Sequence, residues 1–157
     1  MERRARTMSW EDPAPGAKAA QEMSGLECLR AMIRKDFPGP PIARLIGFGF
    51  VELEEGRVVF ECEPTECDYN PVGSVHGRLA CTLFDSAMGC AVHTELPAGV
   101  GYTTVELKVN LLRPITAANG RLLCEATRST SEDASPPPRR ASLTRRTSST
   151  ATPPRRA

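Results

Sequence analysis

The chain has 157 residues, of which 40% are hydrophobic and 25% are charged, which suits one ordinary globular domain but not two separate cores. Its formal net charge of +1 gives no sign of a nucleic acid, an anionic membrane or a strongly charged protein as partner. No stretch approaches the roughly 20 apolar residues of a membrane span, so we expect a cytoplasmic protein that binds no membrane and no nucleic acid.

Six cysteines are spread singly along the sequence and none of them forms a CxxC pair. This spacing favours buried free thiols over disulfides or a zinc site. We therefore expect no metal and no cofactor.

The N-terminal part contains one expected disordered segment and one expected helix. Residues 1–20 are rich in Arg, Ala and Pro and are predicted to be disordered. A short amphipathic helix is predicted from Ser24, a possible N-cap, to the stop at Pro38. Its apolar positions are Leu26, Leu29, Ile33 and Phe37.

Two apolar runs between residues 42 and 65 predict a β-hairpin, with Gly56 supplying the positive φ of the turn. After a loop at 66–75, a second helix is predicted from His76 to about Leu96. Its faces are small or apolar, apart from Thr82, Asp85 and Ser86, so this helix belongs inside the fold.

The stretch at 102–114 alternates apolar and polar residues, which predicts a strand with one buried face. Another strand is predicted to start at Arg121–Glu125. From residue 127 onward the sequence contains one Leu and no other large apolar residue in 31 positions. We predict a domain at 21–127 that is incomplete, followed by a disordered, low-complexity tail at 128–157.

Three stretches carry a resemblance to a known family: NPVGSVHG (70–77), LFDSAMG (83–89) and TTVELKVN (103–110), the last followed by Arg113-Pro114. They resemble the PaaI-like branch of the hotdog-fold thioesterases, which hydrolyse acyl-CoA thioesters. The resemblance runs from about residue 25 to residue 126. It implies an α+β hotdog fold, in which an antiparallel sheet wraps around a central helix.

The resemblance also implies catalytic roles. The amide of Gly77 polarises the thioester carbonyl, Asn70 positions substrate or water, and His76 assists by hydrogen bonding. Asp85 matches the catalytic carboxylate, acting as general base on water or as nucleophile. Independently, a glycine in the first turn of a helix offers an unpaired N–H and no side chain to obstruct an oxyanion.

Each of these residues also has a plain structural interpretation. Asp85 could be a solvated helix residue, His76 a helix cap, and Asn70 and Gly73 ordinary loop residues. Gly73, Arg78 and Thr104 are candidate substrate-binding positions. Thr104 shares the polar face of its stretch.

Arg78 departs from the family, which usually has a second glycine there. Its side chain either crowds the acyl tunnel or points outward toward CoA phosphates. Both readings stay open.

The spacing of Gly77 and Asp85 predicts an oligomer. Eight residues at ~1.5 Å each separate them by about 12 Å along the helix, so one chain cannot bring both to one carbonyl. Two antiparallel helices related by a two-fold axis would pair Gly77 of one chain with Asp85 of the other. We expect a homodimer, and the resemblance implies a homotetramer.

The C-terminal tail suggests a shift of reading frame near residues 126–128. Relatives continue with two more strands. If GC-rich codons encode 132–144, reading one nucleotide earlier can give GRVATAEARLTD, which alternates as a strand should. The gene's nucleotide sequence tests this hypothesis: stop codons or a lack of strand pattern in the alternative frame would refute it.

The sequence thus predicts hydrolysis of acyl-CoA to free acid and CoA. The alternative is a catalytically inactive acyl-CoA-binding or assembly subunit with the same fold, and a hotdog dehydratase is a more distant rival. Acyl specificity is expected to depend on packing among Leu83, Phe84, Met88 and the partner chain.

Overall fold

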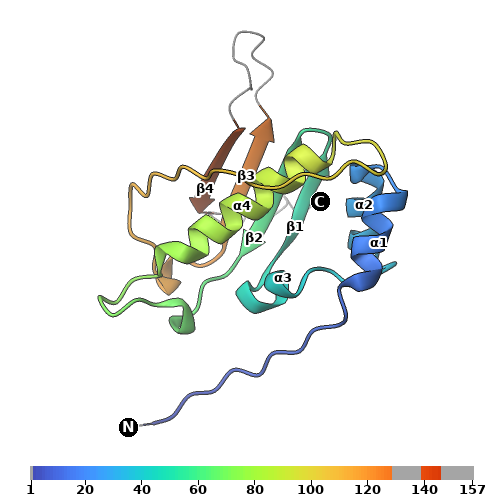
Figure 1. Ribbon diagram of the computed structural model, residues 1–157. Coiled ribbons are helices and arrows are strands. Elements are labelled where there is room, and N and C mark those ends of the chain that lie inside the picture. The colour runs from blue at the N-terminus through green and yellow to red at the C-terminus, as the bar shows by residue number, and fades with distance from the viewer. Residues whose placement is uncertain (1, 129–138, 146–157) are drawn as a thin grey trace, which may run out of the picture.

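The computed structural model describes residues 2–128 and 139–145, which form an antiparallel sheet with one long helix lying across it (Figure 1). The strands pair in chain order, β1-β2-β3-β4. This confirms the predicted α+β architecture. The elements are α1 (Ala14–Glu22), α2 (Gly25–Arg34), α3 (Pro41–Ile46), β1 (Phe48–Glu54), β2 (Arg57–Cys62), α4 (Gly77–His93), β3 (Leu122–Arg128) and β4 (Arg139–Arg145), with short 3-10 helices at Glu66–Asp68 and Ala117–Asn119.

The predicted hairpin is present as β1 and β2, and its turn is closed by the pair Glu54–Arg57. Its first apolar run was predicted from residue 42, but residues 42–46 belong to α3, which begins with Pro41 at its first helical position. Gly56 has φ +71°, a conformation that favours glycine. The register shifts between Phe50 and Glu52, as at a β-bulge. Because of this shift, Leu53 packs against the same core as Phe48 and Phe50, although strict alternation would turn it away.

The core lies between α4 and the inner faces of β2 and β3. On α4, Leu83 and Ala87 are completely buried, which confirms that this helix belongs inside the fold. Facing them, Phe60 pairs with Cys124 and Val58 with Ala126 across the two strands. Burial of this surface is the main force that fixes α4 on the sheet.

The predicted helix starting after Ser24 is α2, and it begins with a capping box. The Ser24 hydroxyl accepts a hydrogen bond from the Glu27 amide at 3.4 Å and donates one to the Glu27 carboxylate at 2.6 Å. The hydrogen bond that the Ser24 hydroxyl donates is the largest cause that lowers the pKa of Glu27, and the bond from the Ser24 amide is the second. The helix start is therefore held by reciprocal bonds.

We expect Ser24→Ala to lower the free energy of unfolding by about 1 kcal/mol, because a helix amide loses its acceptor. Urea denaturation followed by circular dichroism measures the change. Ser9→Ala, in the exposed extended segment before α1, is the control and should change nothing measurable. Equal stabilities of the two variants would contradict the role of the cap.

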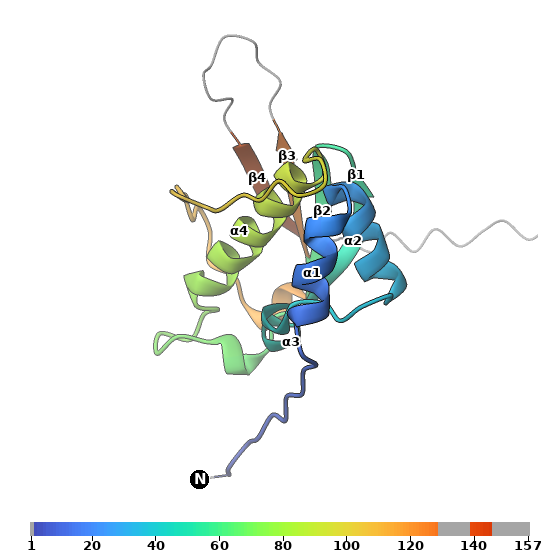
Figure 2. The ribbon, with the colours of Figure 1, turned by 45° about the vertical axis from the view of Figure 1, so that its right-hand side comes forward.

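The structure contradicts one predicted strand. Residues 101–112, here called the crossing segment, form no strand and pass over α4 (Figures 1 and 2). A hollow of about 640 Å³ separates this segment from β4: it is lined by Lys108–Asn110 on one side and by Ala141 and Ser142 on the other. The segment alternates as predicted, but no strand of the described part of the chain pairs with it, so its backbone has no ladder to join there.

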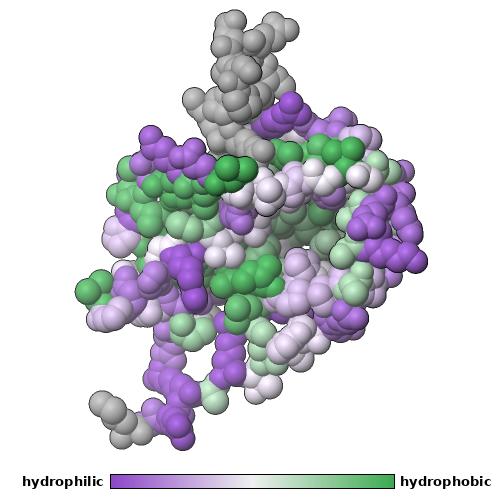
Figure 3. All heavy atoms as spheres, in the orientation of Figure 1, coloured by the Kyte–Doolittle hydropathy of each residue, from purple (hydrophilic) through white to green (hydrophobic). Residues whose placement is uncertain are grey.

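Apolar side chains of the crossing segment are left open to solvent. Val105 is 93% exposed and Leu112 is 89% exposed. Figure 3 shows hydrophobic side chains gathered where this segment passes over the molecule. These side chains are candidates for contact with another molecule, because large contiguous apolar patches mark interaction surfaces.

Two expectations of disorder are corrected. The first concerns residues 1–20, where α1 begins at Ala14, because its Ala, Lys and Gln residues favour a helix and α1 packs against α2, burying Ala19. The second concerns the tail at 128–157, where β4 pairs with β3 along its length. Ala141 and Leu143 pack against the core from alternate positions of β4.

The rest of the predicted tail, 129–138 and 146–157, lies outside the described residues. The proposed frameshift therefore stays a hypothesis that the gene sequence tests.

Candidate active site

Asp85 lies near the middle of α4, on a side of the helix that is open to solvent. The hydroxyl of Thr104, in the crossing segment, donates a hydrogen bond to Asp85 Oδ1 at 2.7 Å. Two residues nominated separately from the sequence are thus in direct contact. The bond engages one carboxylate oxygen and orients the carboxylate, while Oδ2 has no partner among the described residues.

The N-terminus of α4 is arranged by His76. Its Nδ1 accepts a hydrogen bond from the Arg78 amide at 3.0 Å, so His76 is the N-cap of the helix. With Nδ1 as acceptor, the neutral ring carries its proton on Nε2, for which the described residues offer no acceptor. The capping interpretation of His76 is therefore correct, and it leaves a donor at the helix start.

Gly77 is the first residue of α4, and its amide has no acceptor among the described residues. This is expected of the first turn of a helix, whose N–H groups lack intrahelical partners. A Cβ at this position would lie 2.7 Å from Leu111 Cδ1, so the crossing segment packs closely over the glycine. The neighbouring Arg78 side chain is exposed.

The loop before α4 is held by Asn70. Its Oδ1 accepts from the amides of Val72, at 3.0 Å, and Ser74, at 3.2 Å, and its Nδ2 donates to Ser74 Oγ at 2.9 Å. Gly73 has φ +82°, as the turn requires. The side-chain amide of Asn70 is thus used to shape the loop. Both Asn70 and Gly73 therefore have the roles that these residue types commonly have in turns.

Within one chain the nominated residues form two separate groups. One group, Asp85 with Thr104, lies at the rim of a cavity of about 790 Å³. The other group surrounds the N-terminus of α4 and takes no part in lining that cavity; its members are Asn70, Gly73, His76, Gly77 and Arg78. The structure therefore does not bring Gly77 and Asp85 together within a chain.

Sequence reasoning missed several residues around this cavity. Tyr102 packs over α4, where a Cβ on Gly89 would lie 2.7 Å from the Tyr102 hydroxyl oxygen. Phe48 and Phe50 line the cavity from β1. The available signal was the spacing of these two phenylalanines on one face of a predicted strand.

Burial keeps Cys62 and Cys90 from acting as activated nucleophiles. All six are free, as expected, but Cys67 is exposed, which corrects the expectation of a buried thiol there. Cys90 lines the cavity, yet burial raises its pKa to about 12, and burial likewise raises that of Cys62 to about 11. At neutral pH these groups are thiols, which are poor nucleophiles.

Among the described residues, no group of three or more His, Cys, Asp or Glu side chains is placed to hold a metal ion. In the same part of the chain, no helix has both the length and the apolar character needed to cross a membrane.

Comparison with known proteins identifies the family. The domain of unknown function DUF4442 matches residues 39–149, well over half of the chain. The chain belongs to this family. A Halobacterium salinarum protein whose name proposes an esterase is 44% identical over 57 residues, which make up 35% of this chain and 36% of that protein. The match spans about a third of the length of this curated relative.

Solved structures resemble this member of the DUF4442 family over about two thirds of the chain. A Ralstonia eutropha protein, whose name proposes a thioesterase related to phenylacetic acid degradation, has a TM-score of 0.59 and 25% identity, covering 66% of this chain and 79% of that one. A thioesterase family protein of Silicibacter pomeroyi has a TM-score of 0.55 and 25% identity, with coverages of 67% and 71%.

The PaaI protein of the Escherichia coli phenylacetic acid degradation operon has a TM-score of 0.55 at 22% identity, over 70% of this chain and 74% of that one, which shows likeness of fold alone. Together these similarities confirm the PaaI-like hotdog fold expected from the sequence.

Proposed function

We propose that this chain is a thioesterase that hydrolyses acyl-CoA to the free acid and CoA. The observation that carries the proposal is the hydrogen-bonded pair Asp85–Thr104 at the rim of a cavity with a wall of phenylalanine side chains. A carboxylate beside an apolar cavity can activate water next to a bound acyl group. The thioesterase names of two structural relatives support the same reaction class.

In the proposed reaction, Asp85 Oδ2 takes a proton from a water molecule whose oxygen attacks the thioester carbon. Thr104 holds Oδ1, so that the carboxylate stays oriented toward the water. The carbonyl oxygen becomes an oxyanion, the C–S bond then breaks, and the CoA thiolate leaves and is protonated. In a variant of this scheme Asp85 attacks the carbonyl itself, and water hydrolyses the resulting anhydride.

The oxyanion needs a donor, and the proposed one is the Gly77 amide of a second copy. Along α4 the two residues are eight positions, or about 12 Å, apart, so a single chain cannot supply both. Exposed Asp85, Val105 and Leu112 lie on the surface that a second copy would cover. An antiparallel pair of α4 helices would create two equivalent sites in a homodimer.

The other nominated residues have supporting roles in this proposal. The Nε2–H of His76 donates a hydrogen bond near the carbonyl, and Asn70 fixes the loop that presents the helix start. Arg78 is exposed beside Gly77, where it can pair with a CoA phosphate.

The test is a thiol-release assay on purified protein with acetyl-, octanoyl-, phenylacetyl- and benzoyl-CoA. Release of thiol from at least one ester, at a rate proportional to enzyme concentration, is expected. Binding of acyl-CoA without thiol release would select the inactive acyl-binding subunit, and hydration of an enoyl-CoA would select the dehydratase.

A further inference from the structure

We infer that the cavity between α2, α3 and β1 is the acyl pocket, and that it selects an apolar acyl group of medium size. This inference rests on the proposed thioesterase function. It assigns acyl specificity to elements that precede α4 in the chain, whereas the sequence pointed to Leu83, Phe84 and Met88.

The cavity gathers most of the aromatic side chains of the chain. Four of the five phenylalanines line it. The rings of Phe50 and Phe60 lie 4.5 Å apart between centroids, and those of Phe48 and Phe60 lie 5.0 Å apart, so they form a continuous wall. Phe48 and Phe50 are only partly buried, because part of each ring faces the cavity.

Helix α2 adds Leu29, Met32 and Ile33 to the lining of this cavity. Polar side chains line it as well. Asp85, Ser86 and Thr104 come from α4 and the crossing segment, and four charged residues come from elements before β1: Glu11, Lys35, Asp36 and Arg44. A cavity that combines this phenylalanine wall with the hydrogen-bonded carboxylate of Asp85 suits an acyl chain whose carbonyl stops at Asp85.

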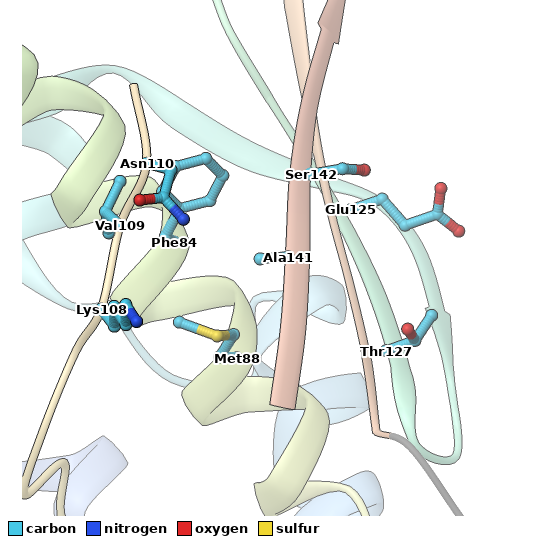
Figure 4. A pocket seen from close by; sticks show the side chains of 9 residues that line it. All are labelled: Phe84, Met88, Lys108, Val109, Asn110, Glu125, Thr127, Ala141 and Ser142. Carbon is cyan, nitrogen blue, oxygen red and sulfur yellow. The ribbon is translucent and has the colours of Figure 1, made fainter. Parts of the chain in front are cut away.

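The residues expected from the sequence lie elsewhere. Leu83 is completely buried in the core, and Phe84 and Met88 line the hollow beside β4 (Figure 4). That hollow also holds the charged Lys108 and Glu125, and Asp85 does not line it. Four-residue spacing puts Phe84 and Met88 on one side of α4, while Asp85 opens into the other cavity.

The cavity volume of about 790 Å³ falls within the roughly 300–1,000 Å³ of pockets that enclose small organic ligands. An acetyl group would leave most of this space filled with water against phenylalanine rings. An acyl group of roughly eight carbons, either linear or aromatic, would displace that water and gain in transition-state binding with each added carbon.

The test compares two variants. Met32→Phe places a larger side chain in the cavity between α2, α3 and β1, and Met88→Phe makes the same change in the hollow beside β4. For the unmodified protein, kcat/KM for octanoyl-CoA or phenylacetyl-CoA should exceed that for acetyl-CoA about 100-fold or more. Met32→Phe should reduce this preference about tenfold, and Met88→Phe should leave it within about twofold. The two larger esters distinguish a linear from an aromatic acyl group.

A preference for acetyl-CoA, or a preference that falls in Met88→Phe and not in Met32→Phe, would overturn the assignment. Ile33→Phe, on the same wall, replaces Met32→Phe if the latter fails to melt cooperatively.

If no ester is hydrolysed, that result refutes the proposed function but does not refute the assignment of the cavity. Calorimetric binding of a non-hydrolysable octanoyl-CoA thioether then tests the cavity: the assignment requires binding that Met32→Phe weakens and Met88→Phe does not, and absence of binding would overturn it.

Discussion

Replacing Asp85 by alanine is expected to lower kcat for acyl-CoA hydrolysis by about 10²–10⁴-fold, the usual contribution of a positioned general base. The reason is that the carboxylate at the rim of the acyl cavity is lost, so water is no longer activated beside the carbonyl. Steady-state thiol release with octanoyl-CoA or phenylacetyl-CoA measures the effect.

Two controls separate catalysis from folding in this experiment. Asp85 is exposed and bonds only to Thr104 among the described residues, so the melting temperature of Asp85→Ala should stay close to that of the unmodified chain. Thr104→Val keeps the carboxylate but removes its hydrogen bond, and should cost only about tenfold in kcat. An Asp85→Ala variant with unchanged kcat would remove the basis of the proposed mechanism.

Gly77→Pro should lower kcat by about 10²–10³-fold, because proline has no N–H and one oxyanion donor is lost. The position is suited to this change. Gly77 is the first helical residue, where proline is well tolerated, and His76 has φ −63° and ψ 132°, the extended conformation that a residue before proline prefers. The same thiol-release assay measures the loss.

The matched control is Gly77→Ala. It adds the Cβ that meets Leu111 but keeps the amide, so it reports the steric cost alone. If Gly77→Ala and Gly77→Pro lose activity equally, the amide is not the donor and packing against the crossing segment explains the loss.

Combining the two inactive variants tests whether sites are shared between chains. In a heterodimer of Asp85→Ala with Gly77→Pro, one site carries both changes and the other carries neither. With random pairing, about a quarter of the unmodified activity should return when the two are co-expressed. No recovery, despite verified heterodimers, would mean that each site is built within one chain.

Local sequence patterns determined much of this structure. The Ser24 cap, the Gly56 turn and the apolar α4 are set by nearest-neighbour geometry and by hydrophobic periodicity, both of which can be read along the chain. The resemblance of the motif around Gly77 and Asp85 likewise predicted the hotdog fold, and the structural relatives confirm that fold.

Only the tertiary structure decided the features that depend on distant partners. The alternation at 102–114 predicted a strand, but a strand forms only beside another edge, and a hollow separates this segment from β4. Conversely, β4 formed in a polar tail because β3 offered it an edge to pair with. The contact between Thr104 and Asp85, and the phenylalanine wall of the cavity, arise from chain segments that sequence spacing alone cannot bring together.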